Sequence, residues 1–291
     1  MEWNFLLRND LKNLFKNSKA GHMQNLIKTG RAFYGIGLAG IGLQQFIYAD
    51  FRPVILPEWP SWIPWLTAWA YLAGTALIIA GAVIIFSKKA RKTALVLGVA
   101  FLFFFVAFHL TYQLFFSPYS FHLGLWTDPL KELAFSGGAF VIAGSYPEEK
   151  LLADKSPVDN LMDAFIAIGS IFFSVTMIVF GMDHFLYTEF VATLVPGWMP
   201  WHVFWTYFAG VALIGAGICI IFKIQLKLVG LLLGIMLFIW FVILHIPRAV
   251  VDPYVDKGNE VTSVFEALAF SGIAFMISCM PMGNIKQGEI P

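Results

Sequence analysis

The stretch from Phe180 to Arg248 decides how this chain is read. It begins with GMDHFLY (181–187), ends with LHIPR (244–248), and holds a Trp/Pro-rich turn and two long apolar runs between them. An earlier stretch repeats this order, with QFIYAD (45–50) at its start and FHL (108–110) at its end. We therefore predict that the chain is a tandem duplication.

The composition indicates an integral membrane protein. Hydrophobic residues make up 59% of the chain and charged residues 13%, whereas soluble domains carry about 25% charged residues. The formal net charge of +1 gives no strong attraction to nucleic acid, so we expect no nucleic-acid partner. Cys219 and Cys279 lie in apolar runs without a CxxC spacing, which argues against redox or zinc chemistry.

Eight apolar runs approach the length that spans a bilayer. They cover residues 32–50, 65–87, 93–116, 129–146, 161–187, 201–223, 227–246 and 263–281. Since the bilayer offers no water to backbone groups, we expect these runs to be helices. The predicted fold class is an all-α membrane protein with eight transmembrane helices, arranged as two parallel tandem four-helix units.

Basic residues predict the orientation and the domain boundaries. The N-terminal segment 1–31 is basic and amphipathic, which predicts a helix on the membrane surface, and basic residues also fill the loops 88–92 and 223–227. The units would be 32–146 and 161–281, joined by a cytoplasmic linker at 147–160 and followed by a tail at 282–291. Both termini would then lie in the cytoplasm.

The repeat can be followed residue by residue. Gly74 corresponds to Gly210 and His109 to His245, and the runs LAFSGGAF (133–140) and LAFSGIAF (268–275) close the two copies. Because each copy has four spans, the copies should share one orientation, related by an axis along the membrane normal. Glycines such as Gly42 and Gly215 are expected to let helices approach closely.

Four segments of the second copy resemble the DoxX-type family of bacterial membrane proteins. They are DHF (183–185), VPGWMP (195–200), FWTYFAG (204–210) and LHIPR (244–248). The resemblance implies four-helix units in a bacterial inner membrane. It also implies a link to quinone chemistry, since a few members are subunits of a thiosulfate:quinone oxidoreductase. The first copy departs from the pattern, with Gln45 in place of the His.

The candidate site gathers the ionisable groups of the second copy. Charged groups at membrane depth are costly unless they are paired or hydrated, so we expect them to meet inside the bundle. The predicted site residues are His184, His245, Arg248 and Glu266, together with Asp183 and Tyr207. The matching region of the first copy, around His109 and Tyr112, should be more apolar and better filled.

A structural interpretation of the same residues stays open. Ser263 to Glu266 matches a capping box, and Asp128-Pro129 matches an N-cap followed by a first-turn proline. Arg248 could pair with Asp252 or face lipid headgroups, and His245 could link helices by a hydrogen bond.

The same histidines suggest two other kinds of cofactor site. Haem ligation by His109 and His245, and a metal site of His184, His245 and Glu266, have suitable ligand types but no supporting local spacing. The sequence predicts no metal, and no catalytic signature is present. Quinone is the one candidate cofactor.

Three functions of different classes follow. The first is a membrane subunit that binds a quinone or another lipid-soluble molecule near the outer face; as an enzyme it would be a quinone-linked oxidoreductase subunit. The second is a structural membrane protein, or one that binds a membrane or periplasmic partner protein. The third is a small-molecule transporter, which is disfavoured because no span shows a broken centre and no charge is expected at the midplane.

Overall fold

The structure is a computed structural model that describes residues 2–57, 64–88, 90–146 and 155–280, with the backbone alone for residues 2–20 and 256. All elements of these ranges are helical. The main helices are α1 (Glu2–Tyr48), α2 (Leu66–Phe86), α3 (Arg91–Phe104), α4 (Thr111–Phe115), α5 (Thr127–Gly144), α6 (Pro157–Leu186), α7 (Thr188–Leu194), α8 (His202–Ile221), α9 (Leu226–Trp240), α10 (Ile246–Val251) and α11 (Asn259–Ser278). Short helical turns complete the chain: η1 (Phe105–Leu110), η2 (Leu123–Trp126), η4 (Phe241–His245) and η5 (Val255–Lys257).

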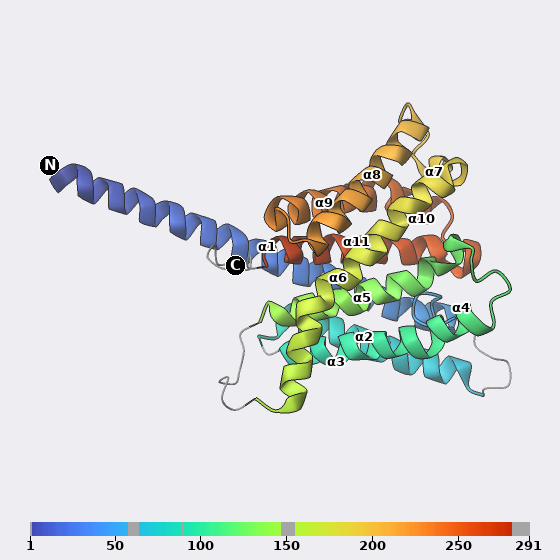
Figure 1. Cartoon of the computed structure of the whole chain (residues 1–291). Coiled ribbons are helices and arrows are strands. Elements are labelled where there is room, and N and C mark those ends of the chain that lie inside the picture. The colour runs from blue at the N-terminus through green and yellow to red at the C-terminus, as the bar shows by residue number, and fades with distance from the viewer. Residues whose placement is uncertain (1, 58–63, 89, 147–154, 281–291) are drawn as a thin grey trace, which may run out of the picture.

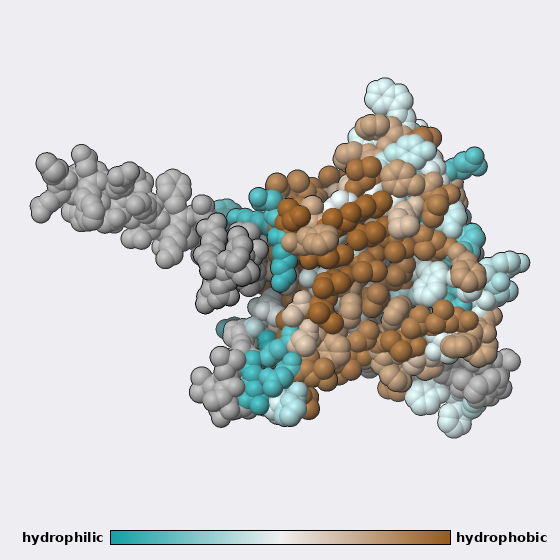
Figure 2. All heavy atoms as spheres, in the orientation of Figure 1, coloured by the Kyte–Doolittle hydropathy of each residue, from teal (hydrophilic) through white to brown (hydrophobic). Residues whose placement is uncertain are grey.

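Six helices of the described ranges are long and apolar enough to cross a membrane, which indicates a multi-pass membrane protein. They are α2, Arg91–Phe115, α6, α8, Leu226–Val251 and α11. The expected span in α5 has the length, with 18 residues, but it carries three charged residues, Asp128, Lys131 and Glu132. Figure 2 shows the surface that fits a bilayer: hydrophobic residues cover the middle of the visible face, and hydrophilic residues gather at its two ends.

The segment 1–31 and the first apolar run belong to one continuous helix. α1 runs from Glu2 to Tyr48 without a break, and its N-terminal part projects away from the bundle (Figure 1). A position of this segment on the membrane surface stays a prediction.

α5 and α11 form the centre of the bundle. They contact each other. In the most apolar 18-residue stretch of α11, 78% of the residues are buried, against 22% in the corresponding stretch of the helix Leu226–Val251. Figure 1 shows both passing through the middle, between α8 to α10 on one side and α2 to α4 on the other. α1 packs on α2 and on α11, and α6 packs on α8 and on α5. The two halves of the chain are therefore not separate bundles, because the first long helix of each half packs on the last helix of the other.

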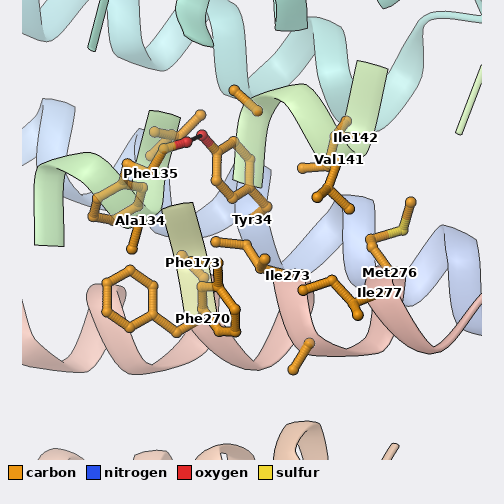
Figure 3. Packing of buried hydrophobic residues seen from close by; sticks show 14 of the residues in the cluster. Tyr34, Ala134, Phe135, Val141, Ile142, Phe173, Phe270, Ile273, Met276 and Ile277 are labelled. Atoms are coloured by element: carbon orange, nitrogen blue, oxygen red, sulfur yellow. Dashed lines mark hydrogen bonds between the residues drawn. The ribbon is translucent and has the colours of Figure 1, made fainter. Parts of the chain in front are cut away.

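Large apolar side chains fill the crossing of these four helices. Figure 3 shows Tyr34 of α1, Phe135 of α5, Phe173 of α6 and Phe270 of α11 packed together, and all four are at most 4% exposed. The hydroxyl of Tyr34 donates a hydrogen bond to the carbonyl oxygen of Phe135 at 2.7 Å. The Tyr34 hydroxyl is the one polar side-chain group among these four residues, and it has the hydrogen-bond partner that burial requires.

Several contacts occur twice, once in each half of the chain. A Cβ placed on Gly42 would lie 2.6 Å from the carbonyl oxygen of Gly74, and one on Gly181 would lie 2.7 Å from that of Gly210. These glycines let helix backbones touch, as expected. The expectation is wrong for Gly215, around which a Cβ would meet nothing within 4 Å.

Serine hydroxyls of α5 and α11 make a second pair of matching contacts. Ser136 donates to the carbonyl oxygen of Gly98, and Ser271 donates to that of Gly234, both at 2.8 Å. The residues before α2 and α8, Trp65 and Trp201, both take left-handed backbone angles, with φ of 63° and 60°. A bulky residue rarely adopts this conformation, and here two tryptophans adopt it at matching places in the two halves.

Two long helices each contain a local irregularity that was not predicted. The helix Arg91–Phe115 contains the π-helical turn η1, and the helix Leu226–Val251 contains the π-helical turn η4. Each turn includes a histidine, His109 or His245, in its last residues. One extra residue in a turn leaves composition and hydropathy unchanged, so these turns could not be predicted from the sequence. Such turns are frequent at functional sites.

Candidate functional site

The contact between α5 and α11 holds a buried ion pair. Lys131 Nζ lies 2.9 Å from Glu266 Oε2 and 3.2 Å from Asp128 Oδ1. The side chains of Lys131 and Glu266 are 12% and 5% exposed, whereas that of Asp128 is 36% exposed. Two charges at this depth are tolerated because they neutralise each other, and the pair ties the two central helices together.

His245 lies beside this pair, at the end of the turn η4. Its ring is within electrostatic range of Lys131, Glu260 and Arg248. The side chain of His245 is partly exposed, but its Nδ1 is buried and has no hydrogen-bond partner among the described residues. Arg248 donates two hydrogen bonds to the carboxylate of Glu260, one of them at 2.9 Å.

We call these residues the central ionisable cluster. It comprises Asp128, Lys131, His245, Arg248, Glu260 and Glu266. Its members come from α5, α11 and the helix that carries η4, so both halves of the chain contribute to it.

The structure brings three of the six predicted site residues into this cluster, namely His245, Arg248 and Glu266. Their partners differ from those expected. Arg248 pairs with Glu260 rather than with Asp252.

The predicted capping box at Ser263 to Glu266 and the predicted N-cap at Asp128 are both wrong. α11 begins at Asn259 after Gly258, so Glu266 lies two turns inside the helix and pairs with Lys131 instead of capping. α5 begins at Thr127, so Asp128 is in its first turn rather than at the N-cap.

The other predicted residues have separate surroundings. His184 Nδ1 lies 2.7 Å from the carbonyl oxygen of Phe180, and its ring stacks on Trp240 with centroids 6.2 Å apart. Tyr207 is 43% exposed and stacks on Phe185.

Asp183 keeps a buried oxygen that has no partner in the described part of the chain. Its side chain lies within electrostatic range of His122, in the segment before α5. None of the contacts of His184, Asp183 or Tyr207 links them to the central ionisable cluster.

The first half is not the apolar region that we expected. His109 Nε2 lies 3.4 Å from Glu132 Oε2, and the two side chains are 3% and 0% exposed. Neither oxygen of Glu132 has a hydrogen-bond partner among the described residues, and the same holds for both polar atoms of the buried Gln45. The expectation is wrong because it compared the first half with the second only at the aligned positions, and Glu132 has no charged counterpart there.

A loop closes the first half on the side of His109. Residues 51–56 fold inward, with Arg52, Val54, Ile55 and Leu56 at most 5% exposed, and the ring of His109 lies near the backbone of Val54. The corresponding segment of the second half is α7, which has no buried residue. The two histidines therefore differ in access: His109 is 2% exposed, and His245 is partly exposed.

This loop is fastened to the segment before α11. Asp50 pairs with Lys257 at 2.8 Å, and Arg52 donates a hydrogen bond to the carbonyl oxygen of Lys257. The guanidinium of Arg52 lies 4.3 Å from the ring centroid of Tyr48, whose hydroxyl bonds to the carbonyl oxygen of Pro253. Burial lowers the pKa of Arg52, and the charge of Asp50 opposes this shift. We call residues 48–52 with 253–258 the clasp.

The geometry does not favour a metal or haem. No group of three His, Cys, Asp or Glu side chains in the described ranges could hold a metal ion. Glu266 is engaged by Lys131 rather than by His184 or His245, and His109 faces Glu132. A surface hollow of 570 Å³ is lined by Trp201, His202, Val203 and Phe204, none of which belongs to the cluster.

Sequence reasoning missed Lys131, Glu132 and Glu260. The signal was available for the first two, since they are adjacent charges within an apolar run, where charges usually mark a site.

No protein-family model, curated protein or solved structure matches this chain.

Proposed function

We propose that the chain is an eight-span protein of a bacterial inner membrane, formed by duplication of a four-span unit, with both termini in the cytoplasm. The paired contacts support this arrangement: Gly42 with Gly74 and Gly181 with Gly210 join the first two spans of each unit in the same way. The parallel orientation of the units, and membership of the DoxX-type family, are part of the proposal.

We further propose that the protein binds the polar head of a lipid-soluble molecule, a quinone, at the central ionisable cluster. The observation that carries the proposal is His245, which is partly exposed while its Nδ1 is buried without a partner. A buried polar atom without a partner is rare and costs about 1–3 kcal/mol, so a ligand or water that supplies the missing bond would be stabilising.

The surroundings of His245 suit such a ligand. A quinone carbonyl oxygen accepts hydrogen bonds, and His245, Lys131 and Arg248 are the donors nearby. Neighbouring residues that face outward are apolar, with Ile239 46% and Val242 43% exposed, so a hydrocarbon tail could stay in the lipid. The absence of buried residues in α7 distinguishes this half from the first, where Arg52, Val54, Ile55 and Leu56 are buried.

Binding of a short-chain quinone would test the proposal. Purified protein in lipid nanodiscs would be titrated with decylubiquinone, following quenching of tryptophan fluorescence, with Trp240 close to the site. We expect saturable quenching in the wild type and a loss of affinity of at least tenfold in His245→Ala. His109→Ala is the matched control and should bind normally, and equal binding by both variants would refute the site.

A structural role is the second candidate, and the Lys131–Glu266 pair is the observation that favours it. This pair and the clasp both join the two halves of the chain. In that case the protein would serve as a scaffold for a membrane or periplasmic partner protein. Wild-type protein that binds no quinone, and whose lipid extract contains none, would favour this role.

A further inference from the structure

The pair His109 and Glu132 is independent of the quinone proposal. It lies in the first half, where Glu132 is fully buried and His109 is 2% exposed. The 3.4 Å contact between Nε2 and Oε2 is the one ionic contact that either side chain makes among the described residues. The other described charges near the pair are Asp128, which acts on His109, and Lys131, which is engaged by Glu266 and Asp128.

An ionised carboxylate in this position would have no adequate compensation. Removing a carboxylate from water costs several kcal/mol unless hydrogen bonds or a well-placed countercharge replace the solvent. Glu132 has neither, because both oxygens lack hydrogen-bond partners and the nearest base is at 3.4 Å. The lower-energy arrangement keeps the proton on the carboxyl group and the imidazole neutral.

We propose that Glu132 and His109 form a buried proton-binding site, in which Glu132 carries the proton and exchanges it with water through Asp128. Asp128 precedes Glu132 by four residues on α5 and so lies on the same face of the helix, one turn closer to its exposed end. Its side chain is 36% exposed and can meet water, whereas the backbone of Val54 closes the other approach to His109.

The exchange is an acid–base transfer without redox change. Asp128 takes up a proton from water and transfers it to the Glu132 carboxylate on the same face of α5, and Glu132 becomes a neutral carboxylic acid that faces the neutral imidazole of His109. Release follows the same atoms in reverse. The site therefore stores one proton inside the bundle. Glu132, which carries it, directly follows Lys131, the partner of Glu266.

Infrared spectroscopy of the whole protein in nanodiscs tests the site directly. A protonated carboxyl group gives a carbonyl stretch that ionised carboxylates lack and that shifts in D₂O. We expect this band near neutral pH in the wild type, moved by ¹³C labelling of glutamate, and lost in Glu132→Gln. Glu260→Gln is the matched control and should keep the band, because Arg248 holds Glu260 ionised.

Labelled wild-type protein decides the question even if Glu132→Gln does not fold. Absence of a glutamate carboxyl band near neutral pH would overturn the proposal, and so would persistence of the full band in Glu132→Gln. The route is tested separately by the rate at which the band shifts after transfer to D₂O. Asp128→Asn should slow this rate, and an unchanged rate would overturn the role of Asp128.

Discussion

The buried pair Lys131–Glu266 gives the sharpest stability prediction. Lys131→Met leaves Glu266 as an unpaired carboxylate that is 5% exposed, which costs about 3–5 kcal/mol. The lost contact with Asp128 adds at most about 1 kcal/mol, because that side chain is 36% exposed. We therefore expect Lys131→Met to lower the free energy of unfolding by about 4 kcal/mol.

Two further variants complete a double-mutant cycle with Lys131→Met, and their free energies of unfolding should follow a defined order. Glu266→Gln leaves Lys131 with Asp128 and with an amide oxygen as acceptor, so its cost should be about 1–3 kcal/mol. The double variant Lys131→Met/Glu266→Met removes both charges and keeps the volume nearly constant. Its stability should lie within about 1 kcal/mol of the wild type, or above it.

Equilibrium unfolding in mixed micelles, followed by circular dichroism, measures these differences. Lys257→Met is the matched control, since Lys257 is 73% exposed in its pair with Asp50 and should matter by less than about 1 kcal/mol. A double variant as unstable as Lys131→Met would refute the reasoning, because the loss would then come from packing rather than from an uncompensated charge.

Three further predictions concern packing, topology and the clasp. Gly74→Leu should destabilise the protein by about 1–3 kcal/mol in a thermal unfolding assay, whereas Gly215→Leu should change stability by less than about 0.5 kcal/mol. A cysteine at Gly197 should react with a membrane-impermeant maleimide in intact cells, and one at Lys223 only after permeabilisation; the reverse pattern would invert the topology. Arg52→Ala should cost about 1–3 kcal/mol through lost bonds in the clasp, and an unchanged unfolding midpoint would contradict the proposed fastening.

The sequence was sufficient for the fold class but not for the packing. Long apolar runs predicted an all-helical membrane protein correctly, because length and hydropathy decide whether a helix can cross a bilayer, and six of the eight expected spans meet these criteria among the described residues. They could not predict that α1 packs on α11 and α6 on α5. In the proposed duplication the last helices of the two halves carry nearly the same sequence, LAFSGGAF and LAFSGIAF, so the sequence does not show which of them the first helix contacts.

The site was predicted in part for a related reason. His245, Arg248 and Glu266 were found because ionisable residues stand out in an apolar background. The partner of Glu266 was missed because partners were sought only within the second half, whereas Lys131 comes from the first. Because helices of one half pack on helices of the other, a charge in one half can be neutralised by a residue of the other half.

The proposed alignment of the two copies explains why Lys131 and Glu266 carry opposite charges. Lys131 and Glu266 each stand two residues before an LAFSG run, so in the proposed duplication they occupy the same position. Identical residues there would place like charges together where α5 contacts α11, at a cost that burial makes large. Opposite charges turn that contact into an attraction. They also make the two copies unequal at their centre, and Glu132 extends the difference, since its counterpart is the uncharged Ala267. The asymmetry therefore begins at the contact that joins the halves, with the buried pair His109–Glu132 in the first half and the more accessible His245 in the second.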